Sequence, residues 1–430
     1  MKKLKTLTRT GVLSGLTILA MSSTAMAQTV VDFYYPIQVG GPLATVIEGY
    51  VAQFEAANPD INVVPVYSGN YQDTTTKALT AAKSGNPPAV AVLLATDIFT
   101  LIDEDVIEPI DNLFAADDQA WVDGFMPAYL ASAIVDEHLW AVPFQRSTAV
   151  LYWNKDAFKE AGLDPEKYPT TWDEMVAYGK AVTTKDEAGN AKRWGVGIPG
   201  NPGSAQWLFT ALAAQNGARL MNDAGTEVYL TDPTVIEALE FWRDLSTVEG
   251  IHPPGIQEWG TTPSDFLEGR IAMIWTTTGN LTNIRTNATF DFGVAPYPGH
   301  PNSASALGGG NLYVFKDASD EQKAAALKFI KFLTSDEIQA DWSIHTGYVA
   351  PRDGAWETEA LKAYVAEVPA ADVARKQIST SVPEFSTYEN ARTTKALNDA
   401  IAAALTGGKT PEQALTDAQA EIERILRPYN

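Results

Sequence analysis

The sequence predicts an α/β fold arranged as two lobes. Strand-like and helix-like segments alternate with short connections over residues 30–94, and the alternation resumes after residue 154. This pattern is typical of an open, mostly parallel sheet covered by helices. A long extended stretch, rather than a flexible linker, separates the two regions, and a second extended stretch lies at 307–315. We therefore expect a cleft between lobes that are joined by crossing strands.

The first region follows the order strand, helix, strand, helix, strand. Apolar residues at helical spacing predict the two helices, and Pro59 together with the Pro87-Pro88 pair marks where helices stop. The expected strands are 30–35, 61–66 and 89–94, and the expected helices are 43–54 and 71–83.

A second α/β region follows the crossing segment. Its expected helices are 171–183, 205–215 and 233–247, and its expected strand is 269–275. A strand over 307–315 and helices over 321–333 and 410–426 complete the chain. The expected first lobe comprises 28–142 with about 295–342, and the second comprises 143–294 with about 343–430.

Residues 143–175 are the most informative stretch for function. An extended segment, 143–148, carries Arg146 and Ser147 and continues into the apolar strand 149–153. It offers neither a nucleophile with an adjacent base nor a set of metal ligands. We expect it to cross between the lobes and to line the space between them.

The N-terminal residues have the pattern of a secretory signal peptide. Four basic residues precede a short apolar run, 11–20, and Ala25-Met26-Ala27 forms a cleavage signal. The apolar run is half the length of about 20 residues that a membrane span requires. We expect cleavage after Ala27 and export of the mature chain to the periplasm.

The charge and composition exclude several classes of partner. The formal net charge is −22, which disfavours binding to nucleic acid or anionic lipid. The chain contains no cysteine, so it has no disulfide, thiolate metal site or cysteine nucleophile. We expect neither a cofactor nor a metal.

Catalytic motifs are also lacking in the sequence. The four histidines are far apart, no G-x-S-x-G elbow occurs, and the Gly408-Lys409-Thr410 run lacks the first glycine of a phosphate-binding loop. The glycines 308–310 open a strand, which favours close backbone approach or ligand contact over dinucleotide binding. The sequence indicates a binding protein, with an exported glycosidase as a remote alternative.

Aromatic residues beside polar loop residues suggest a sugar-like solute. Aromatic faces stack on the apolar faces of sugar rings, while amides and hydroxyls bind the sugar hydroxyls. The candidates are Tyr34, Tyr35, Tyr67, Tyr71, Trp207, Trp259, Trp275 and Tyr348.

Several stretches resemble the extracellular solute-binding proteins of ABC transporters, family 1, and most of all its glycerol 3-phosphate-binding members. The resemblance is carried by FEAANPDINVVPVYSGNY (54–71), SGNPPAV (84–90), PFQRSTAVLYWNKDAFKEAGLDP (143–165), TTWDEM (170–175), AMIWTTTGNLTNIR (272–285), LGGGNLYVF (307–315), HTGYVAP (345–351) and GGKTPEQAL (407–415). It implies a type II periplasmic-binding-protein fold and a monomeric, non-enzymatic receptor that delivers a small polar solute to an inner-membrane ABC permease.

The resemblance also implies a set of ligand contacts. The family positions fall on Tyr71, Ser147, Thr277, Gly309 and Tyr348. A basic family position near the C-terminus falls on either Arg392 or Lys395.

Because of two departures from the family pattern, two classes of ligand fit the sequence. Ala95 stands where the glycerol 3-phosphate binders carry an acid, and Arg146 is a charge that they lack. Arg146 could clamp a phosphate through two hydrogen bonds or could be a structural arginine. The ligand is accordingly glycerol 3-phosphate or a glycerophosphodiester, or alternatively a neutral mono- or oligosaccharide.

Overall fold

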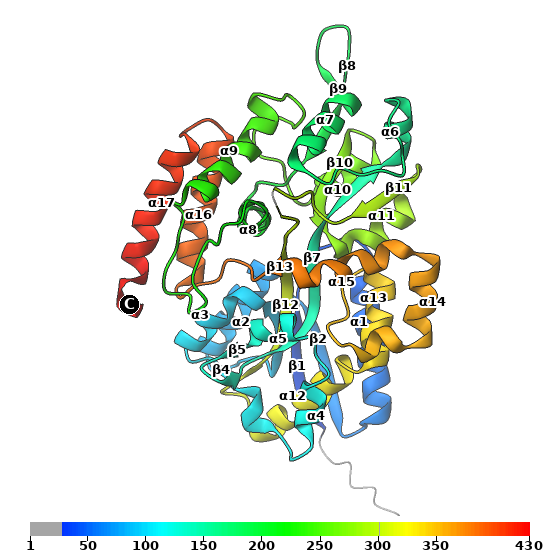
Figure 1. Cartoon of the computed structure of the whole chain (residues 1–430). Helices are drawn as coiled ribbons and strands as arrows, with labels where there is room; N and C mark the ends of the chain where they lie inside the picture. Colours follow the sequence, from blue (N-terminus) through cyan, green and yellow to red (C-terminus); the bar gives the residue numbers. More distant parts are fainter. Residues whose placement is uncertain (1–27, 301) are drawn as a thin grey trace, which may run out of the picture.

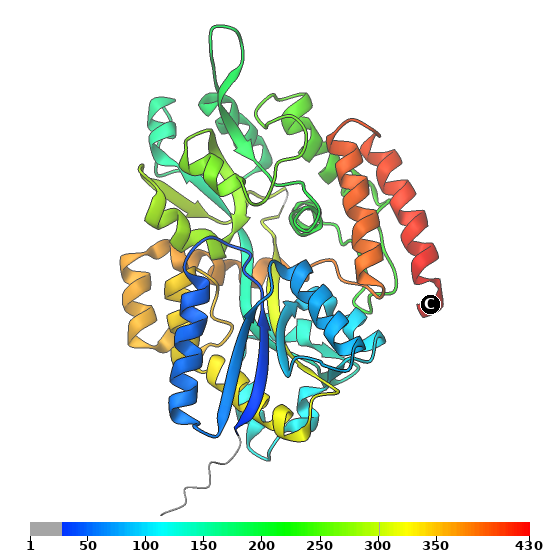
Figure 2. The same cartoon turned by 180° about the vertical axis from the view of Figure 1, so that it is seen from behind.

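The computed structural model describes residues 28–300 and 302–430, and it confirms the α/β class and the two-lobe arrangement. Figure 1 shows one lobe above the other, and Figure 2 shows the same two lobes from behind. The expected signal peptide and its cleavage after Ala27 lie outside the described residues. Within the described ranges, no helix is both long and apolar enough to cross a membrane.

The first lobe contains the three predicted parallel strands in the order β2 (Ile61–Tyr67), β1 (Thr29–Tyr35) and β3 (Val90–Leu94). Helices α1 (Leu43–Ala57) and α2 (Tyr71–Lys83) connect them, as the apolar spacing predicts. The buried face of α1 packs in the first core through Leu43, Ile47, Tyr50, Val51 and Phe54.

The second lobe is built around β10 (Ile271–Thr277), which pairs in parallel with β9 (Ala191–Gly197). β10 begins two residues later than expected because Gly269 has a positive φ of 72° and ends the preceding turn. A large core that includes the fully buried Trp242 and Trp275 receives residues from α7 (Trp172–Val182), α8 (Ala205–Gln215), α9 (Pro233–Thr247), α16 (Asn390–Leu405) and α17 (Pro411–Leu426).

Two long strands join the lobes. β7 (Val142–Asn154) is buried along its whole length and merges the predicted extended segment and strand into one element. Its first half pairs antiparallel with β12 (Ser305–Phe315), and its second half pairs with β10 and β11 (Phe292–Ala295). β12 also pairs with β3, so a single mixed sheet continues from one lobe into the other (Figure 1). The sequence correctly predicts that 143–148 crosses between the lobes.

The glycines at the start of β12 permit close packing at this crossing. Gly309 has φ of 99°, and a Cβ atom there would lie 1.9 Å from the carbonyl oxygen of Gln145. A Cβ on Gly308 would lie 2.7 Å from the Trp207 ring, and one on Gly310 would lie 2.8 Å from the Tyr71 ring. Close backbone approach therefore explains why this run contains glycine.

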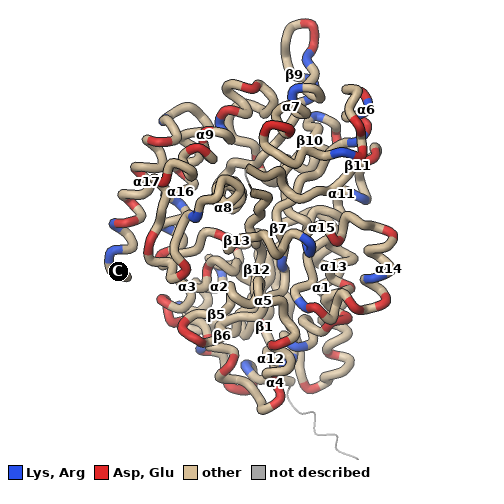
Figure 3. The backbone as a smooth tube through the Cα atoms, viewed as in Figure 1, with Lys and Arg blue, Asp and Glu red and all other residues tan. Residues whose placement is uncertain are grey.

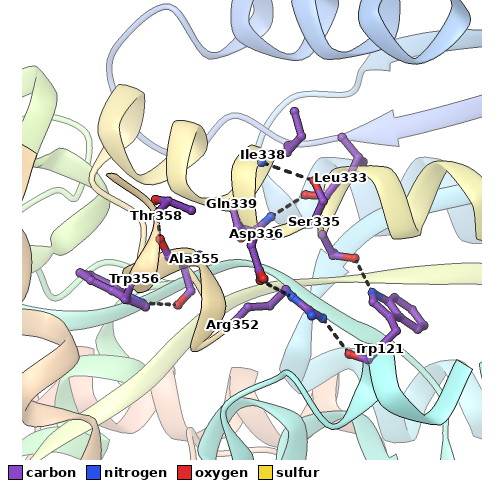
Figure 4. Close-up of polar contacts among 12 residues, drawn as sticks. Trp121, Leu333, Ser335, Asp336, Ile338, Gln339, Arg352, Ala355, Trp356 and Thr358 are labelled. Carbon is purple, nitrogen blue, oxygen red and sulfur yellow. Dashed lines mark hydrogen bonds and ion pairs between the residues drawn. The ribbon is translucent and has the colours of Figure 1, made fainter. Parts of the chain in front are cut away.

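The segment that follows α12 (Asp320–Leu333) and α13 (Asp336–Thr346) is fixed to the first lobe. Arg352 donates from Nε to Asp336 at 2.8 Å and from Nη1 to the carbonyl oxygen of Trp121 at 2.7 Å (Figure 4). Trp342 and Tyr348 pack in the first core. The exact residues at which the chain passes between lobes stay a prediction.

The remaining elements complete the two lobes. They are α3 (Ile98–Asp103), α4 (Asp118–Val122), α5 (Pro127–Leu130), α6 (Lys155–Glu160), α10 (Thr262–Leu267), α11 (Leu281–Asn287), α14 (Glu359–Glu367), α15 (Val373–Gln377), β4 (Ile107–Glu108), β5 (Ile134–Val135), β6 (His138–Leu139), β8 (Thr184–Lys185) and β13 (Ser381–Val382). Acidic residues are spread over the outer helices of both lobes, as Figure 3 shows.

Replacing Gly309 by alanine should lower the free energy of unfolding by more than about 2 kcal/mol, because the new Cβ meets backbone and the φ is unfavourable for L-residues. Gly203→Ala is the matched control, since Gly203 has φ of 93° and no neighbouring atom within 4 Å of an added Cβ. It should cost only about 1 kcal/mol. Denaturation in urea compares the two variants. An equal loss of unfolding free energy in both would contradict the predicted clash between a Cβ at position 309 and the carbonyl oxygen of Gln145.

Candidate functional site

The predicted contact Tyr71 lies at the lobe crossing. It is the first residue of α2, after an Asn70 cap whose side chain accepts from the backbone N–H of Asp73. The Tyr71 hydroxyl donates to Oε1 of Gln145 on β7 at 2.9 Å. Burial, reinforced by the neighbouring Tyr348, raises the pKa of Tyr71 well above its ordinary value, so the phenol is neutral. Tyr71 is thus fixed against the strand that crosses between the lobes.

Tyr348 is brought to the same place from a distant part of the chain. It follows Gly347, which ends α13 in a left-handed conformation with φ of 100°. The Tyr348 ring stacks on Trp342 with centroids 5.9 Å apart, and it lies against Gly279 in the turn after β10. The predicted contact Thr277 holds that turn by accepting from the N–H of Gly279 at 3.1 Å. Thr277 and Tyr348 therefore both lie at this turn.

Ser147 and Gly309 lie on the two crossing strands. Ser147 is opposite Gly308, and Gly309 is opposite Arg146, in the antiparallel register of β7 and β12. Ser147 is buried, and within the described residues its hydroxyl makes no hydrogen bond to another protein group. The structure thus brings together six of the predicted residues: Tyr71, Arg146, Ser147, Thr277, Gly309 and Tyr348.

Arg146 is almost completely buried, and its side chain already makes hydrogen bonds within the protein. Nη1 donates to the carbonyl oxygen of Gly309 and to Oδ1 of Asn311, both at 3.1 Å. The guanidinium lies 5.0 Å from the ring centroid of Tyr129, a cation–π distance. No carboxylate of the described residues is within ion-pair distance, and Nε has no partner there. This geometry favours the structural alternative for Arg146.

Arg392 and Lys395 do not join this group. Arg392 is half exposed and lies 3.3 Å from a carboxylate oxygen of Glu389. Lys395 is exposed and pairs with Asp399 one helical turn further along α16. Neither side chain contributes to the buried polar group in this arrangement, and a ligand role for Arg392 stays a prediction.

The structure adds two carboxyl groups that the sequence did not indicate. Asp97 follows the Ala95 position by two residues and accepts from Oγ1 of Thr75 at 2.8 Å. Burial raises the pKa of Asp97 to about 6 and that of Glu384 to about 8. Arg146 partly offsets the effect on Glu384, whereas Asp97 increases it. The two acids come from positions far apart in the chain, so no local pattern could have revealed that they are neighbours.

Several hydrogen bonds hold the lobes in contact around this group. Trp259 donates from Nε1 to the carbonyl oxygen of Gln38 at 3.2 Å. Ser386 donates from Oγ to the carbonyl oxygen of Thr96 at 2.9 Å, and the N–H of Asn390 reaches Oγ1 of Thr100. The structure therefore has the lobes closed, and the polar group lies between them.

A separate groove of about 670 Å³ opens at the edge of the lobe contact. Phe99, Tyr388 and Tyr429 line it, and Tyr388 and Tyr429 stack with centroids 4.4 Å apart. It contains none of the predicted contacts. The described residues bring together no set of three side chains suited to holding a metal ion.

Comparison with known proteins identifies a family. A family model described as bacterial extracellular solute-binding protein matches residues 49–370. The chain is 30% identical over 428 residues to the sn-glycerol-3-phosphate-binding periplasmic protein UgpB of Salmonella typhimurium, which covers 96% of this chain and 95% of that protein. It is 29% identical over 429 residues to the protein of the same name from Escherichia coli O6:H1 strain CFT073, with the same coverage.

Solved structures give the same fold. UgpB from Mycobacterium tuberculosis in complex with glycerophosphocholine superposes with a TM-score of 0.83 at 25% identity, covering 94% of this chain and all of that one. Maltose-bound MalE3 of T. maritima superposes with a TM-score of 0.80 at 22% identity, covering 92% and 100% of the two chains. The second likeness shows the two-lobed fold alone.

Replacing Arg146 by methionine should lower the free energy of unfolding by about 2–4 kcal/mol, because the buried acceptors on Gly309 and Asn311 lose their donor. Arg392→Met is the matched control and should cost less than about 1 kcal/mol, since an exposed ion pair contributes little. Urea denaturation measures both variants. An Arg146→Met protein as stable as the control would contradict the structural role.

The pKa of Glu384 predicts a pH-dependent stability. The ordinary glutamate pKa is 4.5 and the folded value is about 8, so between these values the folded protein holds a proton that the unfolded chain has released. The free energy of unfolding should therefore fall as the pH rises from 5 to 8. One proton contributes at most about 1.4 kcal/mol per pH unit.

Glu384→Gln should remove this fall of the free energy of unfolding between pH 5 and 8. Glu187→Gln, at an exposed hairpin, should keep the pH dependence of the wild-type protein. Urea denaturation at several pH values tests this, and an unchanged slope in Glu384→Gln would contradict it.

Proposed function

Because the chain belongs to the bacterial extracellular solute-binding family and is a solute-binding component of ABC import rather than an enzyme, we propose that it is a periplasmic receptor. It captures one small polar organic solute between its lobes as a monomer and delivers it to an inner-membrane ABC permease. The signal-like N-terminus and the relatives named as periplasmic proteins support export, with cleavage after Ala27.

The observation that carries this proposal is the convergence of polar side chains from both lobes at the strand crossing. Tyr71 belongs to the first lobe, the Thr277 turn belongs to the second, and Ser147 lies on the strand shared by both. A solute bound by groups of both lobes stabilises the closed form over the open form, because the open form offers only part of the contacts. Binding thereby shifts the population toward the closed shape that a permease would recognise.

Two classes of solute fit the family and the sequence. Glycerol 3-phosphate or a glycerophosphodiester matches the names of the UgpB relatives and the glycerophosphocholine in the M. tuberculosis structure. A neutral mono- or oligosaccharide is the class that the aromatic residues beside polar loop residues indicate. The polar group around Tyr71 contains hydroxyl and amide groups that suit either class.

Small-angle X-ray scattering tests the receptor function. Titration with glycerol 3-phosphate, glycerophosphocholine, and a set of neutral sugars that includes maltose should reduce the radius of gyration for the solute that binds, and that solute should be recovered unchanged. A radius that stays constant at saturation, or conversion of the solute, would overturn the proposal.

A variant pair tests whether lobe contacts belong to the bound form. Trp259→Phe removes the bond to Gln38 and should weaken binding of the same solute several-fold, since one hydrogen bond contributes about 1 kcal/mol. Trp140→Phe removes a bond to Val135 within the first lobe and should leave affinity unchanged. Equal affinities for the two variants would be inconsistent with closure through this contact.

A further inference from the structure

Two segments from different lobes interlock at the edge of the cleft. The first, 96–103, follows β3 and contains α3, whose residues Ile98 and Leu101 are buried in a core cluster of the first lobe. The second, 386–390, leads into α16, and its residue Tyr388 packs against the second core. Figure 1 shows α3 close to the lower end of α16, and the two helices are in contact. The contact between these segments is therefore a contact between the lobes.

Hydrogen bonds join the two segments directly. Ser386 donates from Oγ to the carbonyl oxygen of Thr96 at 2.9 Å, and the N–H of Asn390 donates to Oγ1 of Thr100 at 3.3 Å. The first-lobe partners stand four residues apart, so they lie on one face of the helical segment. This face is turned toward the second lobe.

An aromatic stack lies beside these bonds. The ring centroid of Phe99 lies 4.9 Å from that of Tyr388, and Tyr388 stacks on Tyr429 with centroids 4.4 Å apart and ring planes 13° apart. The Tyr429 hydroxyl donates to Oδ2 of Asp103 at 3.1 Å. The stack thus begins and ends on α3, and aromatic pairs of this kind contribute stability beyond the area that they bury.

The backbone next to the stack is held in an unfavourable conformation. Glu389 has φ of 52° and ψ of 37°, which is left-handed and costly for most L-residues. The N–H of Tyr388 donates to the carbonyl oxygen of Gly225 at 3.1 Å, and a Cβ on Gly225 would lie 3.1 Å from the Phe99 ring. Such conformations persist where surrounding contacts fix them. Here those contacts come from both lobes.

The contact between the segments is nevertheless incompletely packed. The groove of about 670 Å³ lies along it and is lined by Ile102 and Asp136 of the first lobe and by Asp223 and Thr226 of the second. A contact that leaves such a space gains less from packing than a protein core does. This arrangement suits a contact that forms and breaks.

We propose that segment 96–103, together with segment 386–390 and Tyr429, forms a latch that holds the lobes closed and thereby sets the affinity for the solute from outside the solute site. The hydrogen-bonded and stacked residues of the latch are not among the predicted solute contacts. The inference rests on the proposed receptor function and adds to it the residues that control closure.

A latch outside the solute site acts on affinity through the population of closed protein. The apparent dissociation constant equals the intrinsic constant divided by the fraction of protein in the binding-competent form. The latch contacts join the two lobes, so they stabilise the closed form and not the open one. Where the open form predominates without solute, losing a latch contact should weaken binding by the factor by which it lowers the ratio of closed to open protein.

Double electron–electron resonance tests the latch in the protein without solute. The chain contains no cysteine, so Lys77→Cys and Glu240→Cys, at exposed positions of α2 and α9, place one spin label on each lobe. Phe99→Ala and Tyr388→Ala should each lower the ratio of closed to open protein several-fold. The double variant should be little different from either single one, because both changes remove the same contact.

Tyr168→Ala is the matched control for the loss of a ring. The Tyr168 ring packs on Trp153 within the second lobe, with centroids 5.4 Å apart, so its removal should leave the distances between the labels unchanged. Thermal unfolding confirms that each variant is folded, and if Tyr388→Ala does not fold, Phe99→Ala on the other lobe decides.

A second variant pair keeps every ring and changes one hydroxyl. Tyr429→Phe removes the bond to Asp103 and should weaken solute binding about threefold to tenfold, as the loss of one hydrogen bond does. Tyr229→Phe removes a similar bond to Glu227 within the second lobe and should leave affinity unchanged. Isothermal titration calorimetry compares them, with whichever of glycerol 3-phosphate, glycerophosphocholine and maltose binds the wild-type protein.

The outcomes separate the latch from the receptor function. Latch variants with the wild-type ratio of closed to open protein and the wild-type affinity would overturn the latch and leave the receptor function intact. More closed protein or tighter binding in these variants would also overturn it, because the contact would then oppose closure. A wild-type protein with no closed population, either alone or with any of the three probes, would overturn the latch and the receptor function together.

Discussion

The antiparallel pairing of β7 with β12 is the constraint on which the rest of the structure depends. Each strand belongs to the sheet of one lobe at one end and reaches the other lobe, so their pairing joins the two cores into one sheet. The pairing requires the backbone at Gly309 to approach Gln145 more closely than any side chain would allow. The same contact places Tyr71 and Arg146 next to each other. A change at the crossing would therefore alter stability and the site together.

The crossing also explains how a positive charge is held in the interior. Arg146 has no carboxylate at ion-pair distance within the described residues, and it is stabilised by two carbonyl-type acceptors and the face of Tyr129. A buried charge without such partners would be strongly unfavourable. The positive field that remains stabilises the ionised form of Glu384 and partly opposes the effect of burial. The arginine thus supports the site electrostatically.

The sequence predicts the helices and strands better than it predicts which of them come into contact. The strands and helices of the first region, the crossing at 143–148 and the glycine-opened strand follow from apolar spacing and backbone chemistry. Residues of a shared strand, such as Arg146 and Ser147, could be placed together for the same reason. Asp97 and Glu384 could not, because Asp97 ends a short 3-10 helix, Glu384 lies in an irregular segment, and almost three hundred residues separate them. They lie near each other because of how the two lobes pack, and the spacing of apolar residues along the chain does not predict that packing.

Closure of the lobes is accordingly a balance between contacts that favour it and a desolvation cost that opposes it. The bonds from Trp259 to Gln38 and from Ser386 to Thr96 each contribute about 1 kcal/mol. Enclosing Asp97 and Glu384 removes water from two carboxyl groups, and their raised pKa values show that this is unfavourable for the charged forms. A solute whose polar groups replace the lost water would lower that cost. The enclosed acids at the lobe contact are thereby groups that oppose closure in the absence of a bound solute.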